Sequence, residues 1–147
     1  MTKTKMIILK LLAAFLLIAG LISVAVYFYD QNFKAQREDI LIEIRDFDRT
    51  SHVNTLAGAL GQYRSDHDGK LPLAIDTEGN VCRVDIYSDC SGLIDLGFLL
   101  EDYLVAIPVD PLADEGPSSD YSLQIGEDYS IHINAPRAES GPIAVTR

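Results

Sequence analysis

The stretch of sequence that decides the fold is LLAAFLLIAGLISVAVYFY, residues 11–29, which contains no charged side chain. About 20 apolar residues are enough for a helix to cross the hydrocarbon core of a bilayer, so this run predicts one transmembrane helix. Lys3, Lys5 and Lys10 precede the run, whereas all 22 acidic residues of the chain follow it. Because positive charge is retained on the cytoplasmic side, we expect a cytoplasmic N-terminus and export of residues 30–147.

A cleaved secretory signal is the alternative interpretation of the same segment. Ser23, Val24 and Ala25 place small residues after a basic start and an apolar run, where a signal peptidase cuts. Both interpretations export the remaining chain. The retained anchor predicts a single-pass protein of the cell membrane whose C-terminal domain is periplasmic or extracellular.

Composition limits the number of domains and the class of partner. The chain has 147 residues, of which 48% are hydrophobic, and this allows one folded domain beside the apolar segment. The formal net charge is −10, which excludes nucleic acid as an expected partner because phosphate backbones require a basic surface.

The chain has two cysteines, Cys82 and Cys90, and both lie in the exported part. An isolated pair in an oxidising compartment predicts a disulfide. The alternative is a pair of buried free thiols. A metal site would need further soft ligands nearby, and the sequence has none there.

Residues 30–68 are expected to continue the membrane helix. Apolar residues recur at three-and-four spacing on what we take to be one stripe, and charged residues are expected on the opposite face. The stripe consists of Ile40, Ile44, Phe47, Leu56, Leu60 and Tyr63, and the charged face of Arg45, Asp46, Asp48, Arg49 and Arg64. Gly58 and Gly61 weaken a helix, so we expect another element to approach closely there. Asp68 and Gly69 predict the helix end.

After the helix the pattern changes to loops and strands. Residues 73–80 are expected to form a loop, 81–87 a strand, 92–104 a short helix and 105–120 a loop rich in turn formers. Residues 121–125 and 129–133 alternate apolar with polar side chains, which predicts a hairpin over 121–135. Residues 136–147 are expected to be a loose tail, in which 143–145 is a candidate short strand.

These elements predict an α+β fold in which a long N-terminal helix packs on a small antiparallel sheet. The expected organisation is an N-terminal basic segment and transmembrane helix (1–29), an exported domain (30–135) and a tail (136–147). Within the domain we expect the helix at 30–68, a region with the disulfide at 73–104, a loop at 105–120 and the hairpin at 121–135.

Two blocks of this sequence resemble the type IV pilin and type II secretion pseudopilin family. The first block is RTSHVNTLAGALGQYRSDHDGKLP, residues 49–72, and is similar to the end of the family's long helix. The second runs from Tyr103-Leu104 to Ile107-Pro108-Val109-Asp110-Pro111 and is similar to the segment before the family's last hairpin. The resemblance implies a pilin-like fold and, as partners, other pilin-like subunits or assembly machinery.

The N-terminus departs from the family pattern. Members have a basic leader that ends in Gly, followed by Phe and, four residues later, by Glu; here the equivalent residues are Ala14, Phe15 and Ala19. In the family that Glu is thought to neutralise the amino terminus of a neighbouring subunit. Ala14 and Phe15 are therefore only a candidate processing site, and we expect the chain to remain uncut there, because residues 6–9 and 11–12 would make an unusually apolar leader.

Recognisable catalytic chemistry is not found in the sequence, and we expect no enzymatic activity. His52, His67 and His132 have no metal-ligand spacing, and no nucleophile motif or phosphate loop occurs. Asp110, Asp114, Glu115 and Asp120 crowd one loop, which makes Asp110, Asp114 and Asp120 candidate calcium ligands. The alternative is a solvated acidic loop, and no cofactor besides calcium is expected.

The sequence therefore predicts a non-enzymatic, membrane-anchored, pilin-like or pseudopilin-like structural subunit of a type IV filament or secretion apparatus, such as a minor or tip component. The alternative is a single-pass binding or sensor ectodomain that no longer assembles into a filament. An exported enzyme is the third and least favoured hypothesis.

Overall fold

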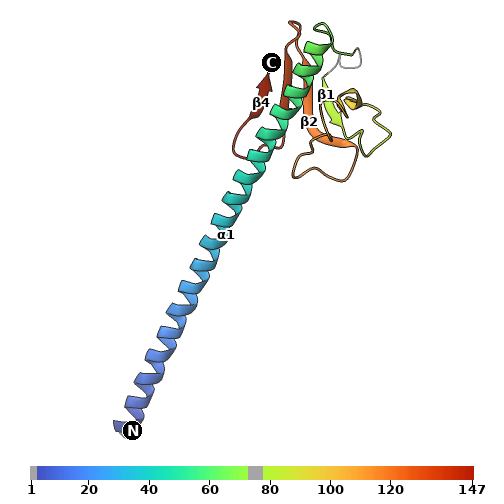
Figure 1. Ribbon diagram of the computed structural model, residues 1–147. Coiled ribbons are helices and arrows are strands. Elements are labelled where there is room, and N and C mark those ends of the chain that lie inside the picture. Colours follow the sequence, from blue (N-terminus) through green and yellow to red (C-terminus); the bar gives the residue numbers. More distant parts are fainter. Residues whose placement is uncertain (1–2, 73–77) are drawn as a thin grey trace. The chain divides into compact units, whose positions relative to one another are not determined.

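The computed structural model describes residues 3–72 and 78–147. The helix α1 (Lys3–Asp66) is followed by β1 (Gly79–Cys82), the 3-10 helix η2 (Gly97–Leu99), β2 (Ser118–Ile125), β3 (Ile131–Ala135) and β4 (Ile143–Thr146). The strands form one antiparallel sheet in the order β1-β2-β3-β4, and α1 packs on it (Figure 1). The predicted α+β fold is therefore confirmed.

Two compact units divide the chain, Met1–Leu41 and Ile42–Arg147. In the first unit the described residues are helical, and their large apolar side chains are exposed. By length and composition α1 contains a stretch able to cross a membrane, and no residue of that stretch is buried. The candidate membrane span predicted from residues 11–29 is therefore present as a helix.

The core of the second unit lies between one face of α1 and one face of the sheet. Val53, Leu56 and Leu60 of α1 are almost fully buried, and Tyr63 packs against the same cluster. The sheet contributes Tyr121, Leu123, Ile131 and Ile133, and the loops contribute Ile94, Leu96, Leu99 and Leu104. Burying one such side chain contributes about 1.5–3 kcal/mol, so this cluster dominates the stability of the domain.

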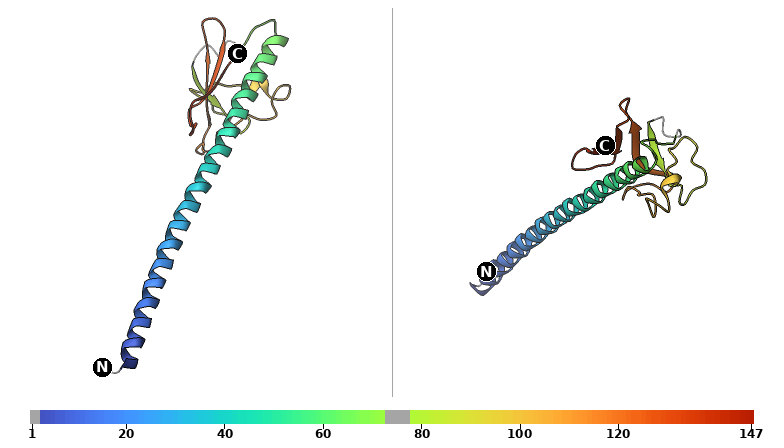
Figure 2. Two further views of the ribbon diagram at one scale, coloured as in Figure 1. Left: turned by 90° about the vertical axis from the view of Figure 1, so that its left-hand side faces the viewer. Right: turned by 45° about the horizontal axis from the view of Figure 1, so that its top comes forward.

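Alternation along the strands separates an apolar from a polar face. Leu123 on β2 pairs with Ile133 on β3, which pairs with Val145 on β4, and all three side chains turn toward α1. The neighbouring row, Ser122 and Asn134, turns away from the core. The predicted hairpin is confirmed, and Figure 2 shows from two further directions that the helix lies beside one side of the sheet only.

The predicted apolar stripe along residues 40–63 is wrong in its first half. Ile40, Ile44 and Phe47 are 53–73% exposed, although Leu56 and Leu60 are completely buried. Nine residues separate Phe47 from Leu56, and at 3.6 residues per turn this places the two side chains on opposite sides of the helix. The sequence thus carries two apolar stripes, of which one faces the sheet.

The expected close approach at Gly58 and Gly61 is also wrong. A Cβ atom added to either glycine would meet no neighbouring atom of residues 3–72 or 78–147 within 4 Å. The packing of the described residues therefore requires neither glycine.

The structure shortens two predicted elements between the helix and β2. The strand expected at 81–87 ends at Cys82, because the amides of Ile86 and Tyr87 bond back to the carbonyl of Arg83 in a turn. Of the helix expected at 92–104, only the single turn η2 forms. The rest consists of turns and isolated bridges: Ile94 pairs with Val81, and Leu104 pairs with Leu100 across a turn at 101–103. Ile94 and Leu104 are both buried in the core. Residues 73–77 of the predicted loop lie outside the described residues.

The expected loose tail is instead integral to the sheet. β4 pairs with β3 from Ala135↔Ile143 to His132↔Thr146, which confirms the candidate strand within residues 143–145. The expected helix end is confirmed within two residues: α1 ends at Asp66, and the amide of Gly69 bonds to the carbonyl of Arg64 at 2.8 Å. Asp68 and Gly69 both have positive φ, as a helix terminating in a left-handed turn requires.

Candidate functional site

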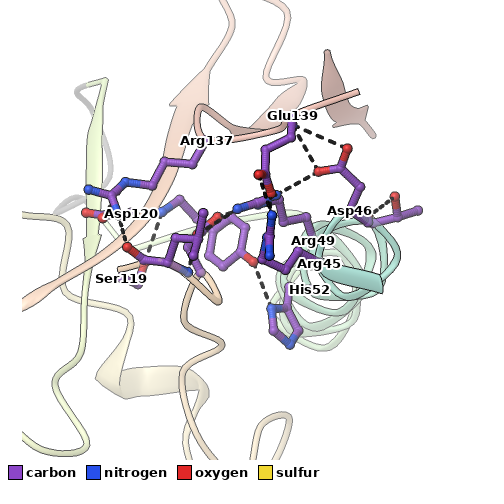
Figure 3. A network of polar contacts seen from close by, with 12 residues as sticks. Arg45, Asp46, Arg49, His52, Ser119, Asp120, Arg137 and Glu139 are labelled. Atoms are coloured by element: carbon purple, nitrogen blue, oxygen red, sulfur yellow. Dashed lines mark hydrogen bonds and ion pairs between the residues drawn. The ribbon is translucent and has the colours of Figure 1, made fainter. Parts of the chain in front are cut away.

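A completely buried arginine, Arg49, joins three segments of the second unit (Figure 3). Its Nε and Nη2 donate to the two carboxylate oxygens of Asp110 at 2.7 and 3.1 Å. Its Nη1 donates to Asp46 at 2.7 Å and to Glu139 at 2.8 Å. The guanidinium group thereby links the helix, the loop before β2 and the loop after β3, and its planar fork suits the two-pronged contact with Asp110.

Asp46 and Arg45 complete the attachment of the loop after β3. The carboxylate of Asp46 accepts hydrogen bonds from the backbone amides of Glu139 and Ser140, the shorter being 2.7 Å. Arg45 donates two hydrogen bonds of 2.7 Å to the carboxylate of Glu139. We call Arg45, Asp46, Arg49, Asp110 and Glu139 the arginine cluster.

The electrostatics of the arginine cluster favour its charged forms. Hydrogen bonds from Arg45 and then from Arg49 lower the pKa of Glu139 to about 2. Burial acts to raise the pKa of Asp46, but hydrogen bonds from the amides of Glu139 and Ser140 and from Arg49 outweigh it, so that this pKa is lowered. The hydrogen bond to Asp110 raises the pKa of Arg49 despite its burial. These shifts stabilise the ionised forms of Asp46, Arg49 and Glu139 at neutral pH.

A second arginine ties the same two loops together at the surface. Arg137 donates to Asp114 at 2.9 Å and to the backbone carbonyl of Leu112, and it forms an ion pair of 3.2 Å with Asp120. Asp120 has a φ of 62°, which marks the irregular pairing of β2 with β1. The bulge turns its carboxylate toward Arg137 (Figure 3).

The calcium expectation rested on Asp110, Asp114 and Asp120. The structure separates their roles: Asp110 is buried against Arg49, whereas Asp114 and Asp120 pair with Arg137. Within residues 3–72 and 78–147 no group of three or more His, Cys, Asp or Glu side chains is placed to hold a metal ion. The geometry of the described residues therefore gives the calcium expectation no support.

The three histidines also have separate neighbours. His52 Nδ1 lies 2.8 Å from the hydroxyl of the buried Tyr121, whose pKa is raised by burial and by the charge of Asp110. His67 stacks on Tyr63 with ring centres 3.9 Å apart. His132 lies between the hydroxyls of Ser130 and Thr146 on the outer face of the sheet.

The predicted disulfide is confirmed. Cys82 at the end of β1 is bonded to Cys90, with a Cα–Cα distance of 5.7 Å. Cys82 is completely buried, so the bond fastens the loop 83–89 to the edge of the core. The candidate processing residues Ala14 and Phe15 lie within α1, where Phe15 is exposed. The expectation that the chain stays uncut there remains a prediction.

Sequence reasoning missed most of the arginine cluster, because it placed Arg45, Asp46 and Arg49 on a solvent-facing side of the helix. A signal for Arg49 was present. It lies four residues before Val53 and seven before Leu56, in the same three-and-four spacing as the buried stripe. No comparable signal identifies Glu139, because its partners lie about 90 residues away in the sequence.

Chemically, the arginine cluster is suited to holding segments together. The side chain of Arg49 is inaccessible, and its three carboxylate partners already accept its protons in hydrogen bonds. Residues 134–136 and 138–144 border an open hollow of about 520 Å³, in which Glu139 is the single ionisable lining residue. That lining offers no pair of groups for nucleophilic or acid–base catalysis.

Comparisons with protein-family models, with curated proteins and with solved structures find no match to this chain.

Proposed function

We propose that the chain is a non-enzymatic, membrane-anchored, pilin-like structural subunit of a type IV filament or secretion apparatus, such as a minor or tip component. The observation that carries the proposal is the contact between Arg49 and Asp110. Arg49 begins the first block of sequence that resembles the pilins and pseudopilins, and Asp110 is the acidic residue of the second. A buried ion pair costs stability if either partner is lost, so the two blocks depend on each other.

The order of elements adds support. A helix able to cross a membrane is followed by an amphipathic continuation, and four antiparallel strands pack on that continuation. The Cys82–Cys90 disulfide agrees with export of the sheet domain into an oxidising compartment. Lys3, Lys5 and Lys10 favour a cytoplasmic N-terminus for the anchor.

Ala19 favours a second candidate function, a single-pass binding or sensor ectodomain that stays outside any filament. In the resembling family a Glu at this position pairs with the amino terminus of a neighbour. A chain with Ala there has no carboxylate with which to balance a buried ammonium group, and an unpaired charge is costly in hydrocarbon.

Fractionation of cells that carry the chain and a pilin-type assembly system tests both candidates. The proposal predicts that the full chain resists alkaline extraction from membranes and also occurs in the surface material released by shearing. It predicts that the sheared fraction, but not the membrane fraction, loses the chain when the assembly ATPase is inactivated.

A matched variant separates anchoring from assembly. Ala19→Glu restores the family's carboxylate and should increase the sheared fraction several-fold, whereas Ala14→Gly should act on processing alone. If the Ala19→Glu chain stays in the membrane fraction and is absent from the sheared fraction although the ATPase is intact, the result supports the ectodomain. If the chain is extracted from membranes at high pH, the result contradicts anchoring.

A further inference from the structure

The part of α1 in the second unit has an exposed face that the described residues do not cover. Its residues recur at three-and-four spacing and lie opposite Val53 and Leu60, which face the sheet. We call it the back face; it consists of Ile44, Phe47, Ser51, Thr55, Gly58, Gln62 and Ser65. Six of the seven residues are exposed, and Gly58 is half-buried.

The back face has large apolar side chains at its N-terminal end and mostly short side chains toward its C-terminal end. Phe47 is 73% exposed and Ile44 53% exposed, an unfavourable arrangement for two large side chains that nothing in the domain requires outside. From Ser51 onward the back face carries mostly small or short polar side chains, and Gly58 leaves space that no described atom fills. Small residues in a helix allow a second helix to approach closely, and mid-helix glycine otherwise only destabilises.

Charge at the rim restricts what can bind. The helix charges Arg45, Asp46 and Arg49 are engaged in the arginine cluster. Glu43 and Asp48 lie on the two sides of Phe47, and neither forms an ion pair within residues 3–72 and 78–147. In a parallel pair of identical helices Glu43 would face Asp48 of the other copy, on both sides of the contact. Two like-charge contacts make a second copy a poor occupant.

We propose that the back face binds a parallel helix of a different subunit, one that carries lysine or arginine beside its apolar contact residues. The proposal rests on the proposed function in one respect, because anchoring in a common membrane makes the two helices parallel. Phe47 and Ile44 supply the apolar contact, and Gly58 allows the close approach. Glu43 and Asp48 select a basic partner over a second copy.

The chain itself provides a probe of that chemistry. Glu43→Lys together with Asp48→Lys converts the rim to the charge of the proposed partner and keeps the same helix. The full-length wild-type chain carries a photo-crosslinking phenylalanine analogue at Ser51. It is produced in membranes together with a second copy of distinguishable mass, which is either wild type or the double variant. We expect the mixed pair of wild type and double variant to crosslink about tenfold more than either chain with itself.

Two controls fix the cause of a mixed adduct. Glu115→Lys with Glu127→Lys changes the net charge equally at exposed loop acids and should crosslink no more than wild type. Gly58→Leu in the wild-type copy should reduce the mixed adduct about fivefold, because it fills the space for the second helix. No neighbouring atom in the described part of the chain lies within 4 Å of a Cβ at Gly58, so this variant should keep the protease resistance of the fold.

The outcomes separate the two proposals. Wild-type pairs as abundant as mixed pairs would identify a second copy as the occupant and overturn the inference. A membrane-resident chain without a mixed adduct, or with one indifferent to Gly58→Leu, would overturn it as well. Loss of the chain from the membrane fraction would instead refute the proposed function, whatever the crosslinking shows.

Discussion

Replacing Arg49 by methionine tests whether the arginine cluster holds the sheet domain together. The variant keeps much of the side-chain volume but leaves the buried carboxylate of Asp110 without its ion-pair partner. Removing one partner of a buried pair typically costs about 3–5 kcal/mol. Domains of this size are commonly stable by only about 5–15 kcal/mol, so Arg49→Met should remove a large share of the total.

The assay is urea unfolding of residues 30–147, followed by far-UV circular dichroism at pH 7. All the core and cluster residues lie within the compact unit Ile42–Arg147, so the apolar segment is not needed for this measurement. We expect the midpoint to fall without a change in slope, because the surface exposed on unfolding stays the same.

A double variant distinguishes two causes of destabilisation: the loss of the ion-pair attraction and the burial of an unpaired carboxylate. Arg49→Met with Asp110→Leu removes both charges, and it should be more stable than Arg49→Met alone, because an apolar pair replaces an unpaired buried carboxylate. A cost below about 1 kcal/mol for Arg49→Met, or a double variant as unstable as the sum of its single changes, would refute this account of the cluster.

Four further predictions concern pH, packing, the disulfide and processing. The folded-state pKa values of Glu139 and Asp46 are lowered, so the contribution of these two carboxylates to stability is complete above about pH 5 and should be lost as the pH falls through 4 toward 2. Urea midpoints measure this loss, and a midpoint that stays constant down to pH 2 would contradict the prediction. Leu60→Ala should cost about 2–5 kcal/mol, and a loss below about 0.5 kcal/mol would mean that Leu60 does not reach the core. Protein taken from the cell envelope should yield a peptide with Cys82 and Cys90 two hydrogens lighter than its reduced form, and opening the bond should cost about 2–3 kcal/mol; alkylated free thiols would count against it. Intact mass should correspond to a chain still carrying Lys3, Lys5 and Lys10, and a species that begins at Phe15 would establish cleavage.

Local sequence patterns predicted those elements in which the apolar side chains recur with one period and all face the core. Residues 121–125 and 129–133 alternate apolar with polar side chains, and the structure places Tyr121, Leu123 and Ile133 in the core as that alternation requires. Tyr129 is the exception: it is 76% exposed in the turn before β3, which begins at Ile131. The stripe along α1 was only half correct, because three-and-four spacing persists on both sides of the Phe47–Leu56 interval while the face changes by half a turn.

Elements that depend on partners distant in sequence could not be predicted in the same way. Residues 92–104 have helical spacing, but Ile94 pairs with Val81 as an isolated bridge, and the leucines turn individually into the core. Tertiary burial overrode the local preference there. The cluster partner Glu139 lies in a polar segment whose composition is typical of a tail. Contacts with residues distant in sequence, among them those of Glu139 with Arg45 and Arg49, hold that segment in place.

The sequence separations in the arginine cluster set an order of events during synthesis. Arg49 leaves the ribosome 61 residues before Asp110 and 90 residues before Glu139. At about 5–20 residues per second, the guanidinium group waits several seconds for its first buried partner from the loops and longer for its last. During that interval Arg49 lies on the helix face that is buried in the folded domain, before the loop residues that pair with it have been made. A newly made chain therefore cannot complete its core gradually from the N-terminus; the domain closes late, when the segment before β4 arrives.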